Sequence, residues 1–509
     1  MVAAGLRRRA VQSAMKFRSL VHGCSLVGFL FLAGCGSDRA TTFPLETLRS
    51  PQSSAEQRAT AIDRLSEAAK ANEIAAQRVR TDLESIVRSE SSPRESRVAT
   101  LTALLASTGE KADAANRKLA IDLLPTEREP RIVSMLAAAA RERNWTQASP
   151  ALIRSLARAN DTPVRDRDEA KSLAALAQGR SLEELLFEQF VNPSTGDATG
   201  AVAADIASRV RVDAWDVLAQ LDPTGQQRQS LLAQPVEPKA PGASAIAQLK
   251  RATTDLRVLA SSGSEVTWLL SIKPDAADKA WWQEVTQAVA KVPQSEQLSM
   301  RHLEAIRLAN RTDASLLSKS REELLSVLES RIASRRKALR VWKAPIPPYK
   351  ETLGEQRSRL SWADALTILT IDTMLTPPSV REALIPQARA DEADRSTEYG
   401  GVLVARTEAG TERVWPVLYV PRAGQRRGDM VFNPSDDMLL TSGTALAHFH
   451  LHAQETSNVN LAGPAEDDVA YANLQRRACV LFTPLGDGKF NVDYYGPGSV
   501  VVDLGTLPW

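Results

Sequence analysis

The chain has 509 residues, of which 43% are hydrophobic and 24% are charged, so its composition excludes a disordered protein. Its length is too great for one hydrophobic core and suggests about three units. Residues 1–34 hold five basic and no acidic residues, so the net charge of +2 becomes −3 once they are removed. This balance excludes a dedicated nucleic-acid binder, and we expect no nucleic-acid partner.

Residues 1–34 predict a targeting segment. After the basic MKFR comes LVHGCSLVGFLFL, an apolar run too short to span a bilayer comfortably and suited to a signal-peptide core. The run ends in Leu32-Ala33-Gly34-Cys35, which resembles the bacterial lipoprotein signal. The resemblance implies cleavage before Cys35 and lipidation of its sulfur. The alternative is an incidental thiol in an uncleaved anchor, and either Met1 or Met15 is the start.

The lipoprotein resemblance also implies a location. We expect a lipid anchor in the bacterial cell envelope, on the periplasmic face, with the membrane and an envelope protein or peptide as partners. Gly36 follows the cysteine. Lipoproteins of this type that stay in the inner membrane commonly have Asp there, so the outer membrane is favoured. Beyond Cys35 the only cysteine is Cys479. Any metal site must therefore use histidines and carboxylates.

After a linker over 35–49, helical signals run to about residue 345. Recurrent Ser and Pro at helix starts accompany apolar residues spaced three and four apart, for example Ser92-Pro93-Arg94-Glu95, where the predicted helix stops at Gly109. Short amphipathic helices joined by short turns resemble HEAT-type helical repeats over 50–190. A second helical region is expected over 191–345. The spacing shows no strict period, so a non-repetitive helical domain is the alternative.

A Pro-rich segment at 344–350 precedes a change of pattern, and we place the main domain boundary there. Two helices are expected, at 361–375 and 379–389. After residue 395 the runs alternate with a period of two, which predicts strands; they are GVLVAR, VWPVLYV, TALAHFHLH, ACVLFT, KFNVDYY and SVVVDL. One helix, starting at Pro464, interrupts them. Residues 350–509 therefore predict a separate α/β domain.

Three of the five histidines, His448, His450 and His452, lie in one strand at a spacing of two. Residues at i, i+2 and i+4 of a strand share a face, with neighbours about 6 to 7 Å apart, so two of these imidazoles can converge on one metal. A polar, solvent-facing strand is the alternative for such a pattern. The strand also leads to a helix whose first turn holds Glu466, Asp467 and Asp468, which brings carboxylates close in sequence.

These residues resemble the JAMM (JAB/MPN) metalloenzymes, whose motif is a Glu strand, a His-x-His strand and a Ser-x-x-Asp helix in that order. Glu398 before Gly400-Gly401-Val402-Leu403 matches the first part, His450-Leu451-His452 the second, and Ala465-Glu466-Asp467-Asp468 the third. The resemblance covers about 355–509. It implies zinc held by His450, His452 and Asp468, with Asp467 as an alternative ligand because the interval after His452 is a few residues longer than in compact members.

The resemblance further implies a reaction. Two imidazoles and one carboxylate leave a zinc position for water, and Glu398 is expected to take the water proton and pass it to a leaving amine. The reaction that the resemblance implies is hydrolysis of an amide or isopeptide bond. The chain departs from the motif at Ala453, in place of Pro, and at Ala465, in place of the Ser whose hydroxyl helps to stabilise the oxyanion.

We therefore expect a multidomain chain, with an all-α HEAT-like solenoid followed by an α/β JAMM-like domain over 350–509. Two functional hypotheses remain. The first is a membrane-anchored zinc metallohydrolase whose helical repeats bind a partner. The second is a non-catalytic, lipid-anchored scaffold whose JAMM-like domain binds metal or is degenerate.

Overall fold

The structure is a computed structural model that describes residues 40, 42–160, 162–196, 199–338 and 351–507. These residues hold 21 α-helices and six strands, in two compact units, one ending at Ala106 and the other beginning at Ser107. The predicted signal segment, Cys35 included, lies outside the described residues, so its lipidation stays a prediction. Within the described ranges no helix has the length and apolar character needed to cross a membrane.

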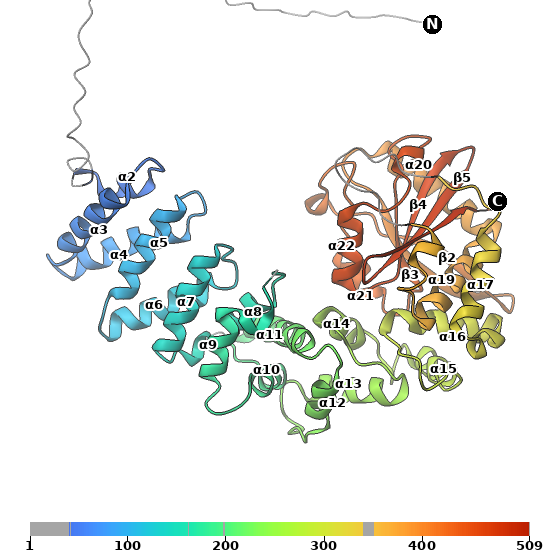
Figure 1. The fold of residues 1–509 in the computed structure, drawn as a ribbon, viewed down its shortest axis with the longest axis horizontal. Coiled ribbons are helices and arrows are strands. Elements are labelled where there is room, and N and C mark those ends of the chain that lie inside the picture. Colours follow the sequence, from blue (N-terminus) through green and yellow to red (C-terminus); the bar gives the residue numbers. More distant parts are fainter. Residues whose placement is uncertain (1–39, 41, 161, 197–198, 339–350, 508–509) are drawn as a thin grey trace, which may run out of the picture. The chain divides into compact units, whose positions relative to one another are not determined.

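The first unit is helical, as predicted. Its helices are α2 (Pro44–Arg49), α3 (Ala55–Ala69), α4 (Glu73–Arg88) and α5 (Arg94–Ala106), and α3, α4 and α5 pack on one another (Figure 1). Ser54 begins α3 with a capping box that includes Gln57. The helix that starts near Ser92 ends at Ala106, before Gly109, and Gly109 immediately precedes the next helix with φ of +99°.

The second unit continues with helices up to the segment 339–350. They are α6 (Glu110–Leu123), α7 (Pro130–Glu142), α8 (Ser149–Ala157), α9 (Asp168–Leu176), α10 (Leu182–Val191), α11 (Gly200–Leu221), α12 (Gln226–Ala233), α13 (Ala243–Asp255), α14 (Gly263–Ser271), α15 (Lys279–Val289), α16 (Leu303–Thr312) and α17 (Arg321–Ile332). Ser181 and Ser320 begin α10 and α17 with capping boxes. Neighbours such as α10 and α11 contact each other, which buries side chains including Phe190 and Trp215.

The C-terminal part adds a mixed six-stranded sheet and more helices. The helices are α18 (Leu353–Gln356), α19 (Trp362–Leu375), α20 (Pro378–Ala393), α21 (Asp436–Thr441) and α22 (Glu466–Gln475). The strands are β1 (Gly400–Glu408), β2 (Thr411–Leu418), β3 (Ala447–Leu451), β4 (Cys479–Gly486), β5 (Lys489–Gly496) and β6 (Val500–Thr506). Their order is β2-β1-β3-β4-β5-β6, and only β3 and β4 pair in parallel. Each predicted strand is therefore present.

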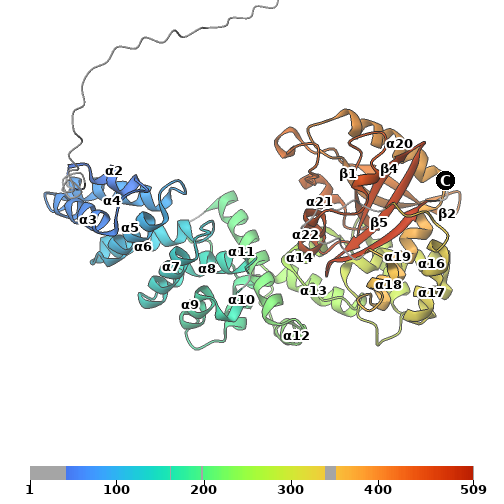
Figure 2. The ribbon, with the colours of Figure 1, turned by 45° about the horizontal axis from the view of Figure 1, so that its top comes forward.

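Helices cover both faces of the sheet, as Figures 1 and 2 show from two angles. On the first face, Val469 and Ala472 of α22 pack against Cys479 and Tyr495, in a cluster of buried residues. On the opposite face lies α19, which is buried along almost its whole length. The crossover from β3 to β4 passes through α22, as a parallel pair requires. This crossover places the start of α22 near the end of β3.

The helices before 339–350 also contact the C-terminal part. Arg331 and Arg335 of the preceding segment form ion pairs with the fully buried Asp372 on α19. His302 lies just before α16, and its Nε2 is 3.0 Å from the carboxylate of Asp364 on α19. The division that the sequence predicts at 345 stays a prediction, but these contacts favour experiments on the whole chain.

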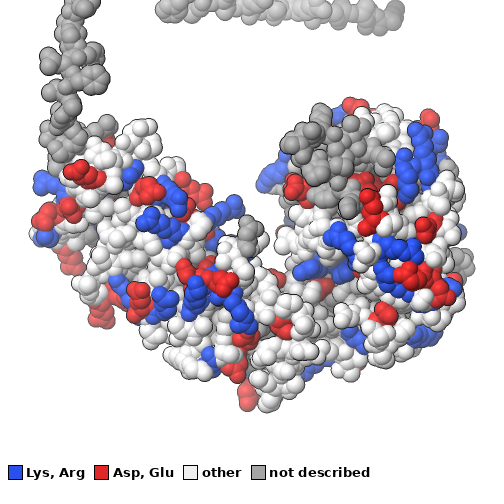
Figure 3. Space-filling model, in the orientation of Figure 1, with Lys and Arg blue, Asp and Glu red and all other residues white. Residues whose placement is uncertain are grey.

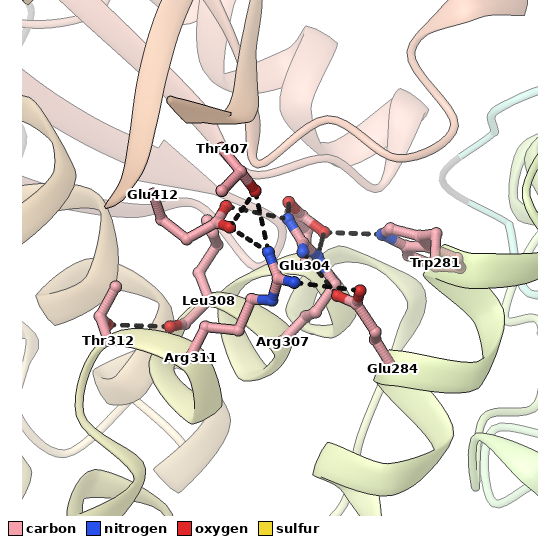
Figure 4. A network of polar contacts seen from close by, with 9 residues as sticks. All are labelled: Trp281, Glu284, Glu304, Arg307, Leu308, Arg311, Thr312, Thr407 and Glu412. Atoms are coloured by element: carbon pink, nitrogen blue, oxygen red, sulfur yellow. Dashed lines mark hydrogen bonds and ion pairs between the residues drawn. The ribbon is translucent and has the colours of Figure 1, made fainter. Parts of the chain in front are cut away.

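A polar network around the buried Glu304 and Arg307 joins the helices to the first hairpin of the sheet (Figure 4). Arg307 on α16 donates two hydrogen bonds to Glu304, at 2.8 and 2.7 Å, and one to Glu284 on α15 at 2.8 Å. Arg311 pairs with Glu412 of β2, whose carboxylate also accepts a hydrogen bond from Thr407 of β1. The network thus fixes the β1–β2 hairpin to α15 and α16.

Charge is mixed over the surface in view. Figure 3 shows acidic and basic side chains interspersed on the described parts of that face. Exposed pairs such as Lys118 with Asp122 belong to this mixture, and such pairs contribute little to stability.

Candidate metal centre

Side chains from two segments of the chain converge beside α22. Glu398 lies two residues before β1, while His450 is on β3 and His452 immediately follows it. All three are buried, with 2%, 1% and 3% of their surface exposed. One possible ligand atom from each lies within 4.8 Å of the others. This buried Glu/His/His cluster could bind a metal ion.

Asp468, in the first turn of α22, lies against both histidines. Its Oδ1 is 3.2 Å from His450 Nε2, and its Oδ2 is 3.5 Å from His452 Nε2. The two Nε2 atoms are 3.3 Å apart. Ligand atoms around a tetrahedral metal with bonds of about 2.0 Å are about 3.3 Å from one another. The separations among His450, His452 and Asp468 therefore fit the donor set of a small tetrahedral ion.

Glu398 lies slightly farther from the histidine Nε2 atoms than Asp468 does. Its Oε1 is 3.8 Å from His452 Nε2 and accepts a hydrogen bond of 2.8 Å from Gln454 Nε2. Glu398 is close enough to both histidines to be a ligand, but the shorter contacts favour Asp468 as the third ligand. We prefer Asp468, because its carboxylate contacts both histidines at 3.2 and 3.5 Å, whereas Glu398 contacts His452 at 3.8 Å.

The two remaining sequence candidates lie elsewhere. Asp467 is exposed on α22, whereas Asp468 faces the histidines. His448 shares the strand face but lies beside a later turn of the helix, where its Nδ1 is 2.7 Å from the Tyr471 hydroxyl. Its Nε2 is buried and has no hydrogen-bond partner among the described residues. Burial and the nearby Arg477 hold the pKa of His448 well below its usual value, so the ring is neutral.

Contacts behind the histidines orient both rings. His452 Nδ1 is 2.7 Å from the Leu461 carbonyl oxygen, which can only accept, so Nδ1 carries the proton. His450 Nδ1 lies 3.0 Å from the Tyr495 hydroxyl on β5. Both rings thus turn Nε2 toward Asp468. Such partners fix the tautomer of metal-binding histidines.

The two carboxylates differ in protonation. Burial raises the pKa of Glu398 to about 7, and the charge of Asp468 adds to this rise, while His452 and the Gln454 hydrogen bond act against it. Burial alone would raise the pKa of Asp468 too, but its interactions with His450 and His452 lower that pKa well below the usual range. Asp468 is therefore held as a carboxylate, whereas Glu398 can gain or lose a proton near neutral pH.

A loop between β2 and α21 covers the cluster. The Phe432 ring stacks on the His450 imidazole, with the centroids 5.7 Å apart and the planes at 6°. A Cβ atom on Gly400 would lie 2.6 Å from the Phe432 ring and 2.5 Å from the Phe449 carbonyl oxygen, so only glycine allows this close approach. Phe432 therefore shields one face of the site.

Ala465 is the N-cap of α22, in place of the Ser of the JAMM motif. The helix starts at Glu466, two residues later than predicted, because Pro464 lies before the cap. The Ala465 N–H donates to Asp468 Oδ2 at 2.6 Å, but its methyl side chain caps no backbone group. The N-terminus of α22 thus lacks a side-chain hydroxyl at its cap.

We expect Ala465→Ser to raise the free energy of unfolding by about 1 kcal/mol, because a serine at N-cap accepts a hydrogen bond from the first turn. Zinc affinity should stay unchanged. Denaturant unfolding and zinc titration measure these effects. Ala470→Ser, an exposed change inside α22, is the matched control and should be slightly destabilising. Equal effects of the two serines would contradict the capping argument.

Sequence reasoning missed Gln454, Tyr495 and Phe432, which contact the cluster from a loop, another strand and a second loop. None carries a signal in the local sequence pattern, because their positions depend on strand order and on loop packing.

The fold and the cluster define a class: a largely helical chain with a C-terminal mixed sheet that carries a buried Glu/His/His cluster able to bind a metal. Comparison with protein families, with curated proteins and with solved structures finds no match to the chain.

Proposed function

We propose that the chain is a zinc-dependent hydrolase of amide or isopeptide bonds, of JAMM type, anchored in a bacterial envelope. The observation that carries this proposal is the mutual approach of His450, His452 and Asp468 to 3.2–3.5 Å, with Glu398 beside them. The order of these residues along the chain matches the JAMM motif. The fold of residues 350–509 as a JAMM-like domain belongs to the same proposal.

The donor set suits zinc, because two imidazoles and one carboxylate form a three-ligand site of the kind found in catalytic zinc proteins. Zinc held there would supply Lewis-acid chemistry and lower the pKa of a water. Asp468 and the two histidines would hold the ion. Glu398 would accept a proton at its carboxylate and later release it to the leaving amine. In the metal-free chain, burial raises the pKa of Glu398 to about 7.

One experiment separates this function from its alternatives. The metal-free whole chain is titrated with zinc and then offered a library of peptide and isopeptide amides. Zinc binding with turnover is the expected result. Zinc binding without turnover favours the second candidate, a non-catalytic scaffold. The absent hydroxyl at Ala465 and the burial of Glu398 and both histidines support that candidate. A chain that binds no zinc contradicts the hydrolase and leaves only the scaffold with a degenerate domain.

We propose that the helical region binds a partner protein or peptide. Successive helices over 50–190 pack on their neighbours within each compact unit, which is consistent with HEAT-type repeats. An envelope protein or peptide is the proposed partner, with the outer membrane as the favoured location.

We expect Cys35→Ser to abolish lipidation and release the protein from the membrane fraction, because the lipid is attached to the Cys35 sulfur in proteins with this signal. Labelling with a radioactive fatty acid and membrane fractionation measure the change. Cys24→Ser, in the apolar run before the cleavage site, is the control and should leave labelling intact. Unchanged labelling of the Cys35 variant would show that the segment is not a lipoprotein signal.

A further inference from the structure

Gln454 contacts Glu398 at the edge of the cluster. Its side chain is buried, with 7% of the residue exposed, and Nε2 donates two hydrogen bonds of 2.8 Å. One goes to Glu398 Oε1 and the other to the Asp429 carbonyl oxygen, in the loop that also carries Phe432. Gln454 therefore links the candidate base to the covering loop.

The orientation of the Gln454 amide follows from its two acceptors. If the amide were turned by 180°, Oε1 would face the Glu398 carboxylate and the Asp429 carbonyl, and neither can donate while Glu398 is ionised. In the observed orientation Oε1 is buried and has no hydrogen-bond partner among the described residues. The two hydrogen bonds donated by Nε2 thus fix the orientation of the amide. They outweigh the unfavourable free energy of leaving Oε1 buried without a partner.

The contact has a consequence for metal binding. Glu398 Oε1, the atom that Gln454 holds, is also the Glu398 atom nearest the cluster, 3.8 Å from His452 Nε2. A small rotation of the Glu398 side chain toward the histidines would place Oε1 at the separations seen for Asp468. Glu398 could then become a fourth protein ligand, and a site filled by four protein ligands has no open position for chemistry.

We propose that Gln454 is a positioning residue that holds Glu398 beside the metal and out of its coordination shell. The inference rests on the proposed function, because it needs a metal at His450, His452 and Asp468. Gln454 would thus keep the fourth position open and leave the carboxylate free to move protons.

The test uses the metal-free whole chain loaded with Co²⁺, whose visible absorption reports coordination, and azide as the probe of an open position. Wild-type protein should respond to azide. In Gln454→Leu, Glu398 is released onto the metal, and the azide concentration for half of the spectral change should rise by about tenfold or more, the range in which outer-shell partners act. Glu398→Gln combined with Gln454→Leu should restore the wild-type response, because a neutral amide is a poor ligand.

Gln387→Leu is the matched control. Gln387 also donates from Nε2 to a backbone carbonyl, that of Pro416 at 2.8 Å, and its Oε1 is also buried without a hydrogen-bond partner among the described residues. This control should leave the azide response unchanged. Should the leucine variant fail to fold, Gln454→Met keeps the length of the side chain and removes the donors.

The outcomes separate the two claims. If cobalt binds but Gln454→Leu responds to azide as the wild type does, Gln454 has no positioning role and the proposed function stands. If the double variant stays as altered as the single one, the effect does not pass through Glu398 and the inference is also wrong. If the wild-type chain takes up no cobalt, the proposed function fails together with the inference.

Discussion

Substitution of His450, His452 or Asp468 by Ala is expected to weaken zinc binding by more than about a hundredfold. This loss is larger than the loss caused by removing a residue that only hydrogen-bonds to a ligand. The physical reason is that three ligands at mutual distances of 3.2–3.5 Å become two, and two cannot hold the ion well. Titration of each metal-free variant with zinc, in competition with a chelator, measures the loss.

Two further variants test the roles within the cluster. Glu398→Gln keeps the shape of the side chain and removes the proton acceptor, so zinc should stay while hydrolysis falls by about a hundredfold or more. His448→Ala should leave zinc affinity nearly unchanged, because His448 contacts Tyr471 and lies outside the cluster. A requirement for His448 without a requirement for His452 would mean that the assigned register is off by two residues.

The second large effect concerns stability. Arg307→Ala is expected to lower the free energy of unfolding by about 3 to 5 kcal/mol, because it leaves buried carboxylates without their partner. Glu304, 4% exposed, accepts two of the Arg307 hydrogen bonds, and Glu412 lies 3.8 Å from the same guanidinium. Burial alone would lower the pKa of Arg307, but its hydrogen bonds to Glu304 and Glu284 raise it above the usual value. The arginine is therefore fully charged.

Denaturant unfolding of the whole chain measures this loss, with Arg209→Ala as the control. Arg209 forms an exposed pair with Asp205, in which both side chains are more than half exposed, so its loss should cost less than about 0.5 kcal/mol. Similar values for the two variants would show that the network in Figure 4 contributes no more than surface pairs do.

Local patterns were enough to predict the secondary structure around the site. Period-two runs correspond to the six strands, and the helices predicted at 361–375 and 379–389 correspond to α19 and α20. The boundaries were less accurate. The predicted run 444–452 is shortened to Ala447–Leu451, because a turn precedes the strand and its last register pair with β4 is Leu451 with Phe482. Such ends depend on the partner strand, which the local sequence does not specify.

The site could be predicted only in part. The spacing of His450 and His452 places them on one face, and the JAMM resemblance pairs them with Asp468 and Glu398. The spacing alone could not separate His448 from these two, since all three share the strand face. Their roles differ because α22 brings Asp468 to the end of β3 and Tyr471 to its middle.

The contacts that complete the cluster come from more distant segments. Tyr495 reaches His450 across the intervening β4, and Gln454 reaches Glu398 from the loop after β3. These contacts arise from the strand order and from the loop that holds Asp429. No periodicity in the sequence encodes either.

The most direct test of the central claim is a zinc titration of the metal-free whole chain by calorimetry, repeated with the Asp468→Ala and Asp467→Ala variants. The account predicts one zinc per chain for the wild type and for Asp467→Ala, whose side chain is exposed, and loss of this binding in Asp468→Ala. Absence of zinc binding to the wild type, or binding that survives Asp468→Ala and disappears in Asp467→Ala, would contradict the account.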